Sequence, residues 1–359
     1  MAVKLGNGNW AVKENKLLAY NDNSGRFFNK EFDFSRGSSA TYVGKDGLIK
    51  SAASDVPRID FSDSTNGALL LEPQRTNLIT YSEDFSNAYW TKTGSSVIVS
   101  NTVISPGGTL NADSFSFTAS TSDKLQRALS VVPNEEYTIS FYIKSDSNIT
   151  IKMGGVAAST PINITTEWVR HTVTQTNSNT TTAYPQLTSN GTAGTIYIWG
   201  AMLEQQSFAT SYIPSLSGSA TTRLADVCNN SGSAQDFNSE EGVLYIEAKV
   251  KTDTIFAANC IAISDGTDAN RLSIIMYGNI NAIRASMNVG GVTQFDFNLP
   301  SGYIQEQYYK IAVSYKVNDC KIFINGTKIS TDTSATMPLL GTFDRLNFDL
   351  GQGLYDFYG

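Results

Sequence analysis

The chain has 359 residues, a formal net charge of -7 and charged side chains at 16% of its positions. This length exceeds one average domain, so we expect two or three. The negative charge argues against a sequence-independent grip on nucleic acid, which requires surplus Lys and Arg. No run approaches the ~20 apolar residues of a membrane-spanning helix, and residues 1–12 lack the apolar core of a secretion signal, so we expect no membrane insertion.

Residues 1–75 predict short, irregular strands rich in Gly and Asp, too polar to fill a large core alone. We therefore expect a separate N-terminal module. Ca²⁺ is an alternative at Asn21-Asp22-Asn23-Ser24-Gly25, and also at Asp265-Gly266-Thr267-Asp268. Neither stretch has the alternate-position ligands and distal Glu of an EF-hand, so ordinary turns are favoured and we expect no cofactor.

Residues 76–214 predict a first β-sandwich. In the stretch 137–144, YTISFYIK, apolar and polar residues alternate with a period of two, as in a half-buried strand. The inward set is Tyr137, Ile139, Phe141 and Ile143, and Thr138, Ser140 and Lys144 take the other face. The stretch 215–240 that follows is small and polar, which is typical of a linker.

Residues 241–359 predict a second β-sandwich, because the same alternation recurs in 243–251 and 311–317. Asn325-Gly326 separates two strand-like runs and signals a hairpin, since a type I′ turn needs positive φ twice. The last five residues predict a strand that stops at Gly359, so a final strand is missing or comes from another chain. We expect an all-β protein: an N-terminal module followed by two β-sandwich (jelly-roll) domains.

Catalytic candidates are few. His171 is the one histidine, and alternation places it on the face of Val169 and Val173, as a core or strand-surface imidazole. The three cysteines show no C-x-x-C spacing, so we expect free, buried thiols and no metal site. Paired carboxylates could hydrolyse glycans, but adjacent strand residues point to opposite faces, so we expect solvated charges and no catalytic residue. The carboxylates considered are Glu135-Glu136, Glu240-Glu241, Asp265/Asp268 and Asp344/Asp349.

Four aromatic residues are candidates for binding a glycan: Tyr89, Trp90, Tyr197 and Trp199. Tyr197 and Trp199 alternate on one face of a strand, and Tyr89-Trp90 follows a polar loop. Exposed rings can stack on sugar faces, with neighbouring Asn, Gln and Ser bonding the hydroxyls. A buried core position is the equally open alternative for each ring.

The stretch Glu72-Pro73-Gln74-Arg75-Thr76-Asn77 follows the apolar run Leu69–Leu71. It could be an active-site loop or a junction between domains. The residues of this stretch alone leave both interpretations open.

Four longer stretches carry a resemblance. FDFSRGSSATYVGKDGLIKSAASDVPRIDF (32–61) and GALLLEPQRTNLITYSEDFSNAYW (67–90) resemble a module of tailed-bacteriophage virion proteins, especially fibres. GAMLEQQSFATSYIPSLSGSATTRLAD (200–226) resembles the end of the carbohydrate-binding-like sandwich that follows that module. Residues 241–359 resemble a concanavalin A/laminin-G-type jelly roll, with YYKIAVSYKVNDCKIFINGTKI (308–329) as its hairpin.

The resemblance implies that the EPQRTN stretch is a structural junction between the module and the sandwich, at Glu72, Pro73, Arg75 and Asn77. Pro73 would interrupt the strand ladder there, and Arg75 would tie the two sides together by hydrogen bonds without acting on a substrate.

The resemblance also implies a structural virion protein, a homotrimeric head or tail fibre without enzymatic activity. Residues 1–75 would attach to other virion proteins of the capsid or tail, and the sandwiches would project toward host-surface glycan. Three alternatives remain open: a virion-borne polysaccharide depolymerase, a capsid decoration protein that binds no glycan, and a bacterial surface adhesin.

Overall fold

The structure is a computed structural model that describes residues 2–5, 10–22, 27–250, 258–278, 280–299, 306–351 and 353–359. These residues form strands, turns and bends without an α-helix, which confirms the all-β class. Accordingly, no described segment is a helix long and apolar enough to span a membrane. The chain divides into two compact units: unit 1 is Met1–Ser39, Ala52–Pro73 and Leu224–Gly359, and unit 2 is Ala40–Ser51 and Gln74–Arg223.

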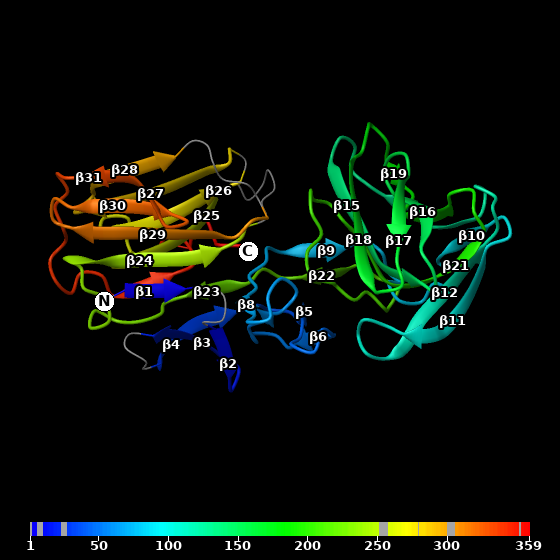
Figure 1. Ribbon diagram of the computed structural model, residues 1–359, viewed down its shortest axis with the longest axis horizontal. Coiled ribbons are helices and arrows are strands. Elements are labelled where there is room, and N and C mark those ends of the chain that lie inside the picture. The colour runs from blue at the N-terminus through cyan, green and yellow to red at the C-terminus, as the bar shows by residue number, and fades with distance from the viewer. Residues whose placement is uncertain are drawn as a thin grey trace. The chain divides into compact units, whose positions relative to one another are not determined.

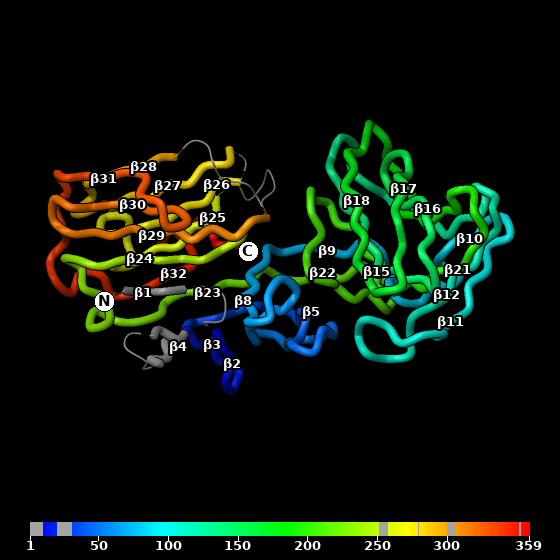
Figure 2. The backbone as a smooth tube through the Cα atoms, in the orientation of Figure 1, coloured from blue at the N-terminus to red at the C-terminus, as the bar shows by residue number. Residues whose placement is uncertain are grey.

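Unit 1 is a β-sandwich of two five-stranded sheets (Figure 1). Figure 2 shows β24 beside β29 although they are far apart in the chain, and both pair in antiparallel register. Sheet A runs in the order β1 (Ala2–Leu5), β24 (Glu241–Ala248), β29 (Tyr309–Lys316), β30 (Cys320–Ile324) and β31 (Thr327–Asp332). Sheet B runs in the order β28 (Val292–Leu299), β27 (Ala282–Val289), β26 (Arg271–Tyr277), β25 (Ala258–Ser264) and β32 (Arg345–Asn347).

The inner faces of these sheets form one hydrophobic core. The alternation in β24 and β29 has the expected direction, because Leu244, Ile246, Ile311 and Val313 are all buried in it. The Asn325-Gly326 turn joins β30 to β31 with positive φ at both residues, as predicted. Burial of the apolar face of each strand is the main stabilising term of such a sandwich.

The N-terminal residues do not form a module apart from this sandwich. β1 adds to sheet A in parallel with β24. Leu17 and Phe32 belong to the same core as Leu244, because the segment lacks the apolar residues for a core of its own. Two further groups of strands lie in this unit: β2 (Trp10–Lys13), β3 (Lys16–Asp22), β4 (Phe27–Ser35) and β23 (Val227–Asn229); and β7 (Ile59–Asp60) with β8 (Ala68–Leu69).

The predicted linker and the predicted incomplete strand also differ from the structure. The stretch 215–240 contains β23, whose Cys228 is buried, and the Asn229 and Asn230 side chains donate hydrogen bonds to Asp349 and Asp33 within unit 1. At the other end, residues 353–359 form no strand. Phe357 and Tyr358 are buried in the core of unit 1, and Gly359 exchanges two backbone hydrogen bonds with Leu71.

Unit 2 is a second β-sandwich (Figure 1). Sheet C runs in the order β11 (Val97–Ile104), β12 (Leu110–Phe117), β21 (Gly194–Glu204), β15 (Glu136–Ser145) and β18 (Val169–Thr176). Sheet D runs in the order β10 (Thr91–Thr93), β13 (Lys124–Gln126), β20 (Gln186–Ser189), β16 (Ile149–Gly154) and β17 (Thr160–Ile164). Three short pairs complete the strands: β14 (Leu129–Ser130) with β19 (Thr182–Ala183), β9 (Arg75–Asn77) with β22 (Thr221–Arg223), and β5 (Ala40–Val43) with β6 (Ile49–Ala52).

The predicted inward face of 137–144 is confirmed, because Tyr137, Ile139, Phe141 and Ile143 are each at most 2% exposed in the core between sheets C and D. Successive strand residues point to opposite faces, so the intervening residues of β15 lie on the outer face of sheet C. That placement defines the surface considered below.

Candidate functional site

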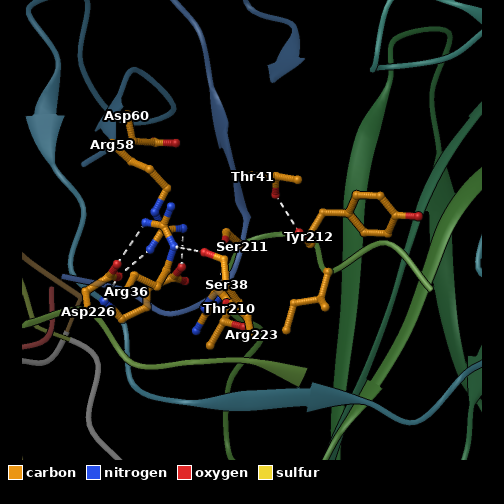
Figure 3. A network of polar contacts seen from close by, with 12 residues as sticks. Arg36, Ser38, Thr41, Arg58, Asp60, Thr210, Ser211, Tyr212, Arg223 and Asp226 are labelled. Carbon is orange, nitrogen blue, oxygen red and sulfur yellow. Dashed lines mark hydrogen bonds and ion pairs between the residues drawn. The ribbon is translucent and has the colours of Figure 1, made fainter. Parts of the chain in front are cut away.

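Four charged residues that lie far apart in the sequence form a buried ion cluster in unit 1: Arg36, Arg58, Glu72 and Asp226. Asp226 binds Arg36 Nη1 at 3.0 Å and Arg58 Nη2 at 2.5 Å (Figure 3). Arg58 Nη1 also binds Glu72 Oε2 at 2.7 Å. The Glu72 amide also donates to Asp226 at 2.7 Å. The side chains of Arg36, Arg58 and Asp226 are fully buried.

The buried ion cluster has a structural role, because its charges are paired with one another inside unit 1. Arg36 also donates to the carbonyl oxygens of Ser38, Ala53 and Val56, so most of its donors are used within the protein. Buried charges persist only when paired and hydrogen-bonded, and a cluster saturated in this way offers little to a substrate. The four charged residues come from the SRG, PRID, EPQ and RLAD segments of the sequence. Those segments therefore supply the charges of one buried cluster in unit 1.

One of the divisions between the units falls between Pro73 and Gln74, inside the EPQRTN stretch. On one side, Glu72 belongs to the buried ion cluster of unit 1. On the other, the Asn77 side chain is fully buried in unit 2, where its Nδ2 donates to the carbonyls of Ala201 and Ile213. Its Oδ1 accepts from the Ile79 and Leu203 amides. Asn77 therefore holds four backbone groups at the start of this sandwich.

Arg75 lies within unit 2. Its Nη1 donates to the Gln74 carbonyl at 2.8 Å, and its guanidinium carbon lies 5.6 Å from the centre of the Phe208 ring. These contacts are those of a packed, buried side chain. The tie across the junction that we assigned to Arg75 stays a prediction.

Two of the four aromatic glycan candidates are wrong as exposed platforms. Trp90 is 2% exposed, packs on Phe85 and Phe141 in the core, and donates from Nε1 to the Tyr81 carbonyl. Trp199 is 4% exposed and packs against Tyr142 and Tyr212. Burial of these rings is the physical reason: neither has a free face on which a sugar could stack.

Tyr89 keeps part of its surface exposed, but the Arg127 guanidinium lies 4.2 Å from the centre of its ring. The same Arg127 donates to the Tyr89 carbonyl at 3.0 Å, and Tyr81 packs 5.3 Å away on the ring. One face of Tyr89 is therefore occupied by a cation within the protein.

Tyr197 is half-buried on the outer face of sheet C, in the part of that face where Val97 and Val99 are exposed; we call this part the Tyr197 face. Register places Val99, Ser114, Tyr197 and Lys144 in one row across β11, β12, β21 and β15. The next row contains Val97, Ser116 and Thr195, where the two hydroxyl groups bond each other at 2.8 Å. Across the two rows, the valines lie at one end, the serine and threonine hydroxyls lie in the middle, and Tyr197 with Lys144 lies at the other end.

A cation and two rings form the other half of the Tyr197 face. Lys144 Nζ lies 5.4 Å from the Trp168 ring centre and 5.7 Å from the Tyr197 ring centre. The Tyr197 hydroxyl donates to exposed Asp146 at 2.9 Å, and this hydrogen bond raises the pKa of Tyr197. Trp168 is held by a hydrogen bond from its Nε1 to the Ile104 carbonyl at 3.0 Å. A ligand would thus meet fixed rings beside a donor and an acceptor.

The apolar end of the face is open to solvent. Val97 is 55% exposed and Val99 is 53% exposed, and both lie in the first half of β11, before its register shifts against β12. Isolated exposed Val residues are ordinary, but these two adjoin the hydroxyls of Ser116 and Thr195 on one surface. Apolar area beside hydroxyl groups suits a saccharide, whose C–H and O–H groups lie on different sides of the ring.

The sequence missed Lys144, Asp146 and Trp168 as members of this face. The outward side of the 137–144 strand pattern already contained Lys144. It did not show that the residue lies beside Tyr197, because strand pairing between 144 and 197 is set by tertiary structure. Trp168 and Asp146 lie at loop ends, where alternation gives no signal.

Among the described residues, the candidates for catalysis and metal binding do not come together in one site. His171 lies opposite Phe141 in the β15–β18 pair, half-buried, and burial lowers its pKa. Asp265 accepts hydrogen bonds from Thr267 and Asn270 of its own loop. Asn21–Gly25, the other suggested calcium site, lies partly outside the described residues. Within the described ranges, no three His, Cys, Asp or Glu side chains gather as a metal site would require.

The paired carboxylates have structural partners or solvent. Glu135, Glu136 and Glu240 are exposed, and Glu241 forms an ion pair with Lys316 at 2.9 Å. Asp344 pairs with Arg345, and Asp349 is buried, where it accepts from the amides of the 351–353 loop. The three cysteines are free and buried, as predicted.

Comparison with known proteins gives weak structural likeness only. No family model and no curated protein matches the chain. Among solved structures it is similar to a CBM4 carbohydrate-binding module, at 20% identity and a TM-score of 0.25 over 27% of this chain and 72% of that one. It is similar to the enzymatically active domain of tailspike protein 4 of bacteriophage CBA120, at 13% identity and 0.28 over 35% and 21%.

A third solved structure covers more of the chain. The N-terminal CBM22-1–CBM22-2 tandem domain of Paenibacillus barcinonensis Xyn10C matches 77% of this chain and 90% of its own length, at 9% identity and a TM-score of 0.29. At TM-scores this low, the likeness supports neither a family nor a function for this chain.

Proposed function

We propose that this protein is a structural component of a tailed-bacteriophage virion, a homotrimeric head or tail fibre whose sandwiches adhere to host-surface glycan. The proposal includes no catalytic activity and no cofactor. Its partners are further copies of itself, other virion proteins and the glycan. The observation that carries the adhesive part is the Tyr197 face, an open sheet surface with fixed rings, hydroxyls and one cation.

The chemistry of this face suits a carbohydrate better than an apolar or highly charged ligand. Ser116 and Thr195 supply hydroxyls and Lys144 a donor within two neighbouring rows of a sheet, and Asp146, just after β15, supplies an acceptor beside Tyr197. Binding sites on rigid strands need little ordering when the ligand arrives. One such face gives weak binding, and three copies in a trimer would multiply it by avidity.

The virion role is supported by the resemblance of 32–61, 67–90 and 200–226 to phage fibre proteins. Four charged residues of these stretches, Arg36, Arg58, Glu72 and Asp226, form the buried ion cluster of unit 1, which supports a structural role for unit 1. We assign glycan binding to unit 2. Because residues 1–39 share a core with 224–359, we propose that unit 1 as a whole, and not a separate 1–75 module, makes the attachment.

The first test is a glycan array probed with the purified protein, followed by titration of the best ligand. Tyr197→Ala should weaken binding about tenfold or more, since a partly buried aromatic anchor contributes ~1.4 kcal/mol or more. Tyr245→Ala is the matched control: it is also a partly exposed strand tyrosine whose hydroxyl bonds a carboxylate, Glu247, but it lies in unit 1. Equal binding by both variants contradicts the assignment of the face.

The same preparation separates the alternatives. Incubation with host capsule that releases oligosaccharide would establish a depolymerase and overturn the non-enzymatic proposal. An array without hits, together with retained binding to virions, would favour a decoration protein.

A further inference from the structure

The outer face of sheet D is a second polar surface of unit 2, which we call the lysine face. Across β13, β20 and β16 it places Lys124, Thr188 and Lys152 in one row, with Thr188 between the two lysines. The adjacent row contains Gln126 and Gln186, next to Gly154. The neighbouring residues Leu125, Leu187 and Met153 are buried in the core, so the row faces away from it.

Two oxygen atoms on this face are buried without a hydrogen bond: Thr188 Oγ1 and Gln186 Oε1. Thr188 is 5% exposed, although it points away from the core. Buried polar atoms without partners cost free energy and are rare, so such an atom on a binding surface marks a position where a ligand can supply the missing bond.

The lysines also lack an acidic partner. The strands of sheet D contain no Asp or Glu. Across the described residues neither Lys124 nor Lys152 forms an ion pair, in a chain whose formal net charge is -7. The nearest carboxylate in sequence, Asp123, is 1% exposed and accepts from the Ser95 and Thr118 amides. The positive charge of this face is therefore not neutralised by sheet D itself.

We propose that the lysine face binds an acidic glycan, a saccharide chain that carries carboxylate groups. The lysines start from strands on either side of β20, roughly 10 Å apart, because neighbouring strands are spaced ~4.8 Å. Their side chains are long enough to converge on one carboxylate above Thr188. That carboxylate accepts from both ammonium groups and from the Thr188 hydroxyl. Gln126 and Gln186 bond the hydroxyls of the adjoining sugar.

An exposed ring completes the surface. Tyr184 is 46% exposed and precedes β20 by two residues, where its amide donates to the Gly155 carbonyl at 2.6 Å. It is therefore available to stack on a sugar beyond the Gln186 row. Two cations in a surrounding of amides and hydroxyls match a chain with spaced charges, whereas nucleic acid needs a larger basic surface.

This inference rests on the proposed adhesive function and names the ligand class of a second surface. The test is calorimetric titration of the full chain with four acidic oligosaccharides: oligogalacturonate, oligomannuronate, hyaluronan oligosaccharide and oligosialic acid. Each is paired with its carboxyl-reduced, uncharged counterpart. At least one acidic form should bind ten times more tightly than its neutral counterpart, and added salt should weaken that binding.

Two variants locate the site. Lys124→Gln/Lys152→Gln should weaken the acidic ligand tenfold or more, whereas Lys310→Gln/Lys328→Gln, an equal change of charge at exposed strand positions of unit 1, should leave it unchanged. Thr188→Val removes a hydroxyl that has no partner in the protein. It should weaken binding several-fold while the melting temperature stays the same or rises.

Binding by none of the four acidic probes overturns the proposal, as does equal binding of acidic and neutral forms or an equal loss in the two double variants. These failures are distinguishable from failure of the Tyr197 face. A ligand whose binding is lost in Tyr197→Ala and kept in Lys124→Gln/Lys152→Gln would retain the adhesive function and overturn this inference alone.

Discussion

The Asp226→Asn substitution tests whether the buried ion cluster holds unit 1 together. The carboxylate accepts from Arg36 Nη1, Arg58 Nη2 and the Glu72 amide, at 3.0, 2.5 and 2.7 Å. Asparagine keeps the shape of the side chain, but it replaces one acceptor oxygen by a donor and removes the negative charge. At least one arginine donor then faces another donor in a site closed to water.

The expected cost follows from these contacts. Breaking a buried ion pair costs about 3–5 kcal/mol, and a hydrogen bond to a charged group ~1.5–3 kcal/mol. Arg36 keeps its three carbonyl acceptors and Arg58 keeps Glu72, so the charges stay partly compensated. We therefore expect Asp226→Asn to lower the free energy of unfolding by about 3 kcal/mol, near the lower end of the range for a broken buried ion pair.

Urea unfolding followed by pulsed hydrogen exchange and mass spectrometry can report peptides of unit 1 and unit 2 separately. Asp296→Asn is the matched control, because Asp296 pairs with Arg284 on the surface of unit 1, where its side chain is 39% exposed. Its loss should be about 0–1 kcal/mol. A loss in Asp226→Asn that does not exceed the control would refute the structural role of the cluster.

Three further predictions concern burial. Asn77→Ala should destabilise unit 2 by about 2–4 kcal/mol, because four hydrogen bonds are lost in a buried site. Denaturant unfolding measures this loss, with Asn163→Ala at an exposed position as the control. Equal losses of stability in the two variants would contradict the prediction. Burial lowers the pKa of His171 from 6.5, so the unfolded chain binds a proton that the native chain does not. The stability of the wild type should therefore fall relative to His171→Gln as pH drops through 6.5; parallel pH profiles would refute this. Burial raises the pKa of each thiol, so a disulfide reagent should label none in the native protein and all three after denaturation; rapid native labelling would contradict their burial. These thiols are Cys228, Cys260 and Cys320.

The sequence was sufficient for the fold class and for the inward faces of single strands. Alternation identifies a strand because burial of one face requires it, as the buried residues of 137–144 confirm. Turn chemistry was equally local: the left-handed geometry at Asn325-Gly326 is a property of the two residues themselves.

Long-range pairing could not be predicted. Leu17 and Phe32 share a core with Leu244, although each lies more than 200 residues before Leu244 in the chain. Nothing in the composition of 1–75 indicates which apolar surface will cover it. The polar stretch 215–240 was taken for a linker because low hydrophobicity is typical of one. It contributes Asp226, whose partners lie at positions 36, 58 and 72.

The exposure of the aromatic rings could not be predicted from the sequence either. Tyr197 and Trp199 alternate on one face of β21 and look equivalent in sequence, yet Trp199 is covered by Tyr142 and Tyr212. The difference depends on residues brought together by the fold. The lysine face is similar: Lys124 and Lys152 become neighbours of Thr188 through strand pairing alone.

Cryo-electron microscopy of intact virions purified from the host strain tests the central proposal most directly, with this chain traced in the density. The account predicts trimeric density on the capsid or the tail, with unit 1 at the particle and unit 2 projecting outward. Absence of the chain from the particle would contradict the virion role and leave a free enzyme or a bacterial adhesin as the remaining alternatives.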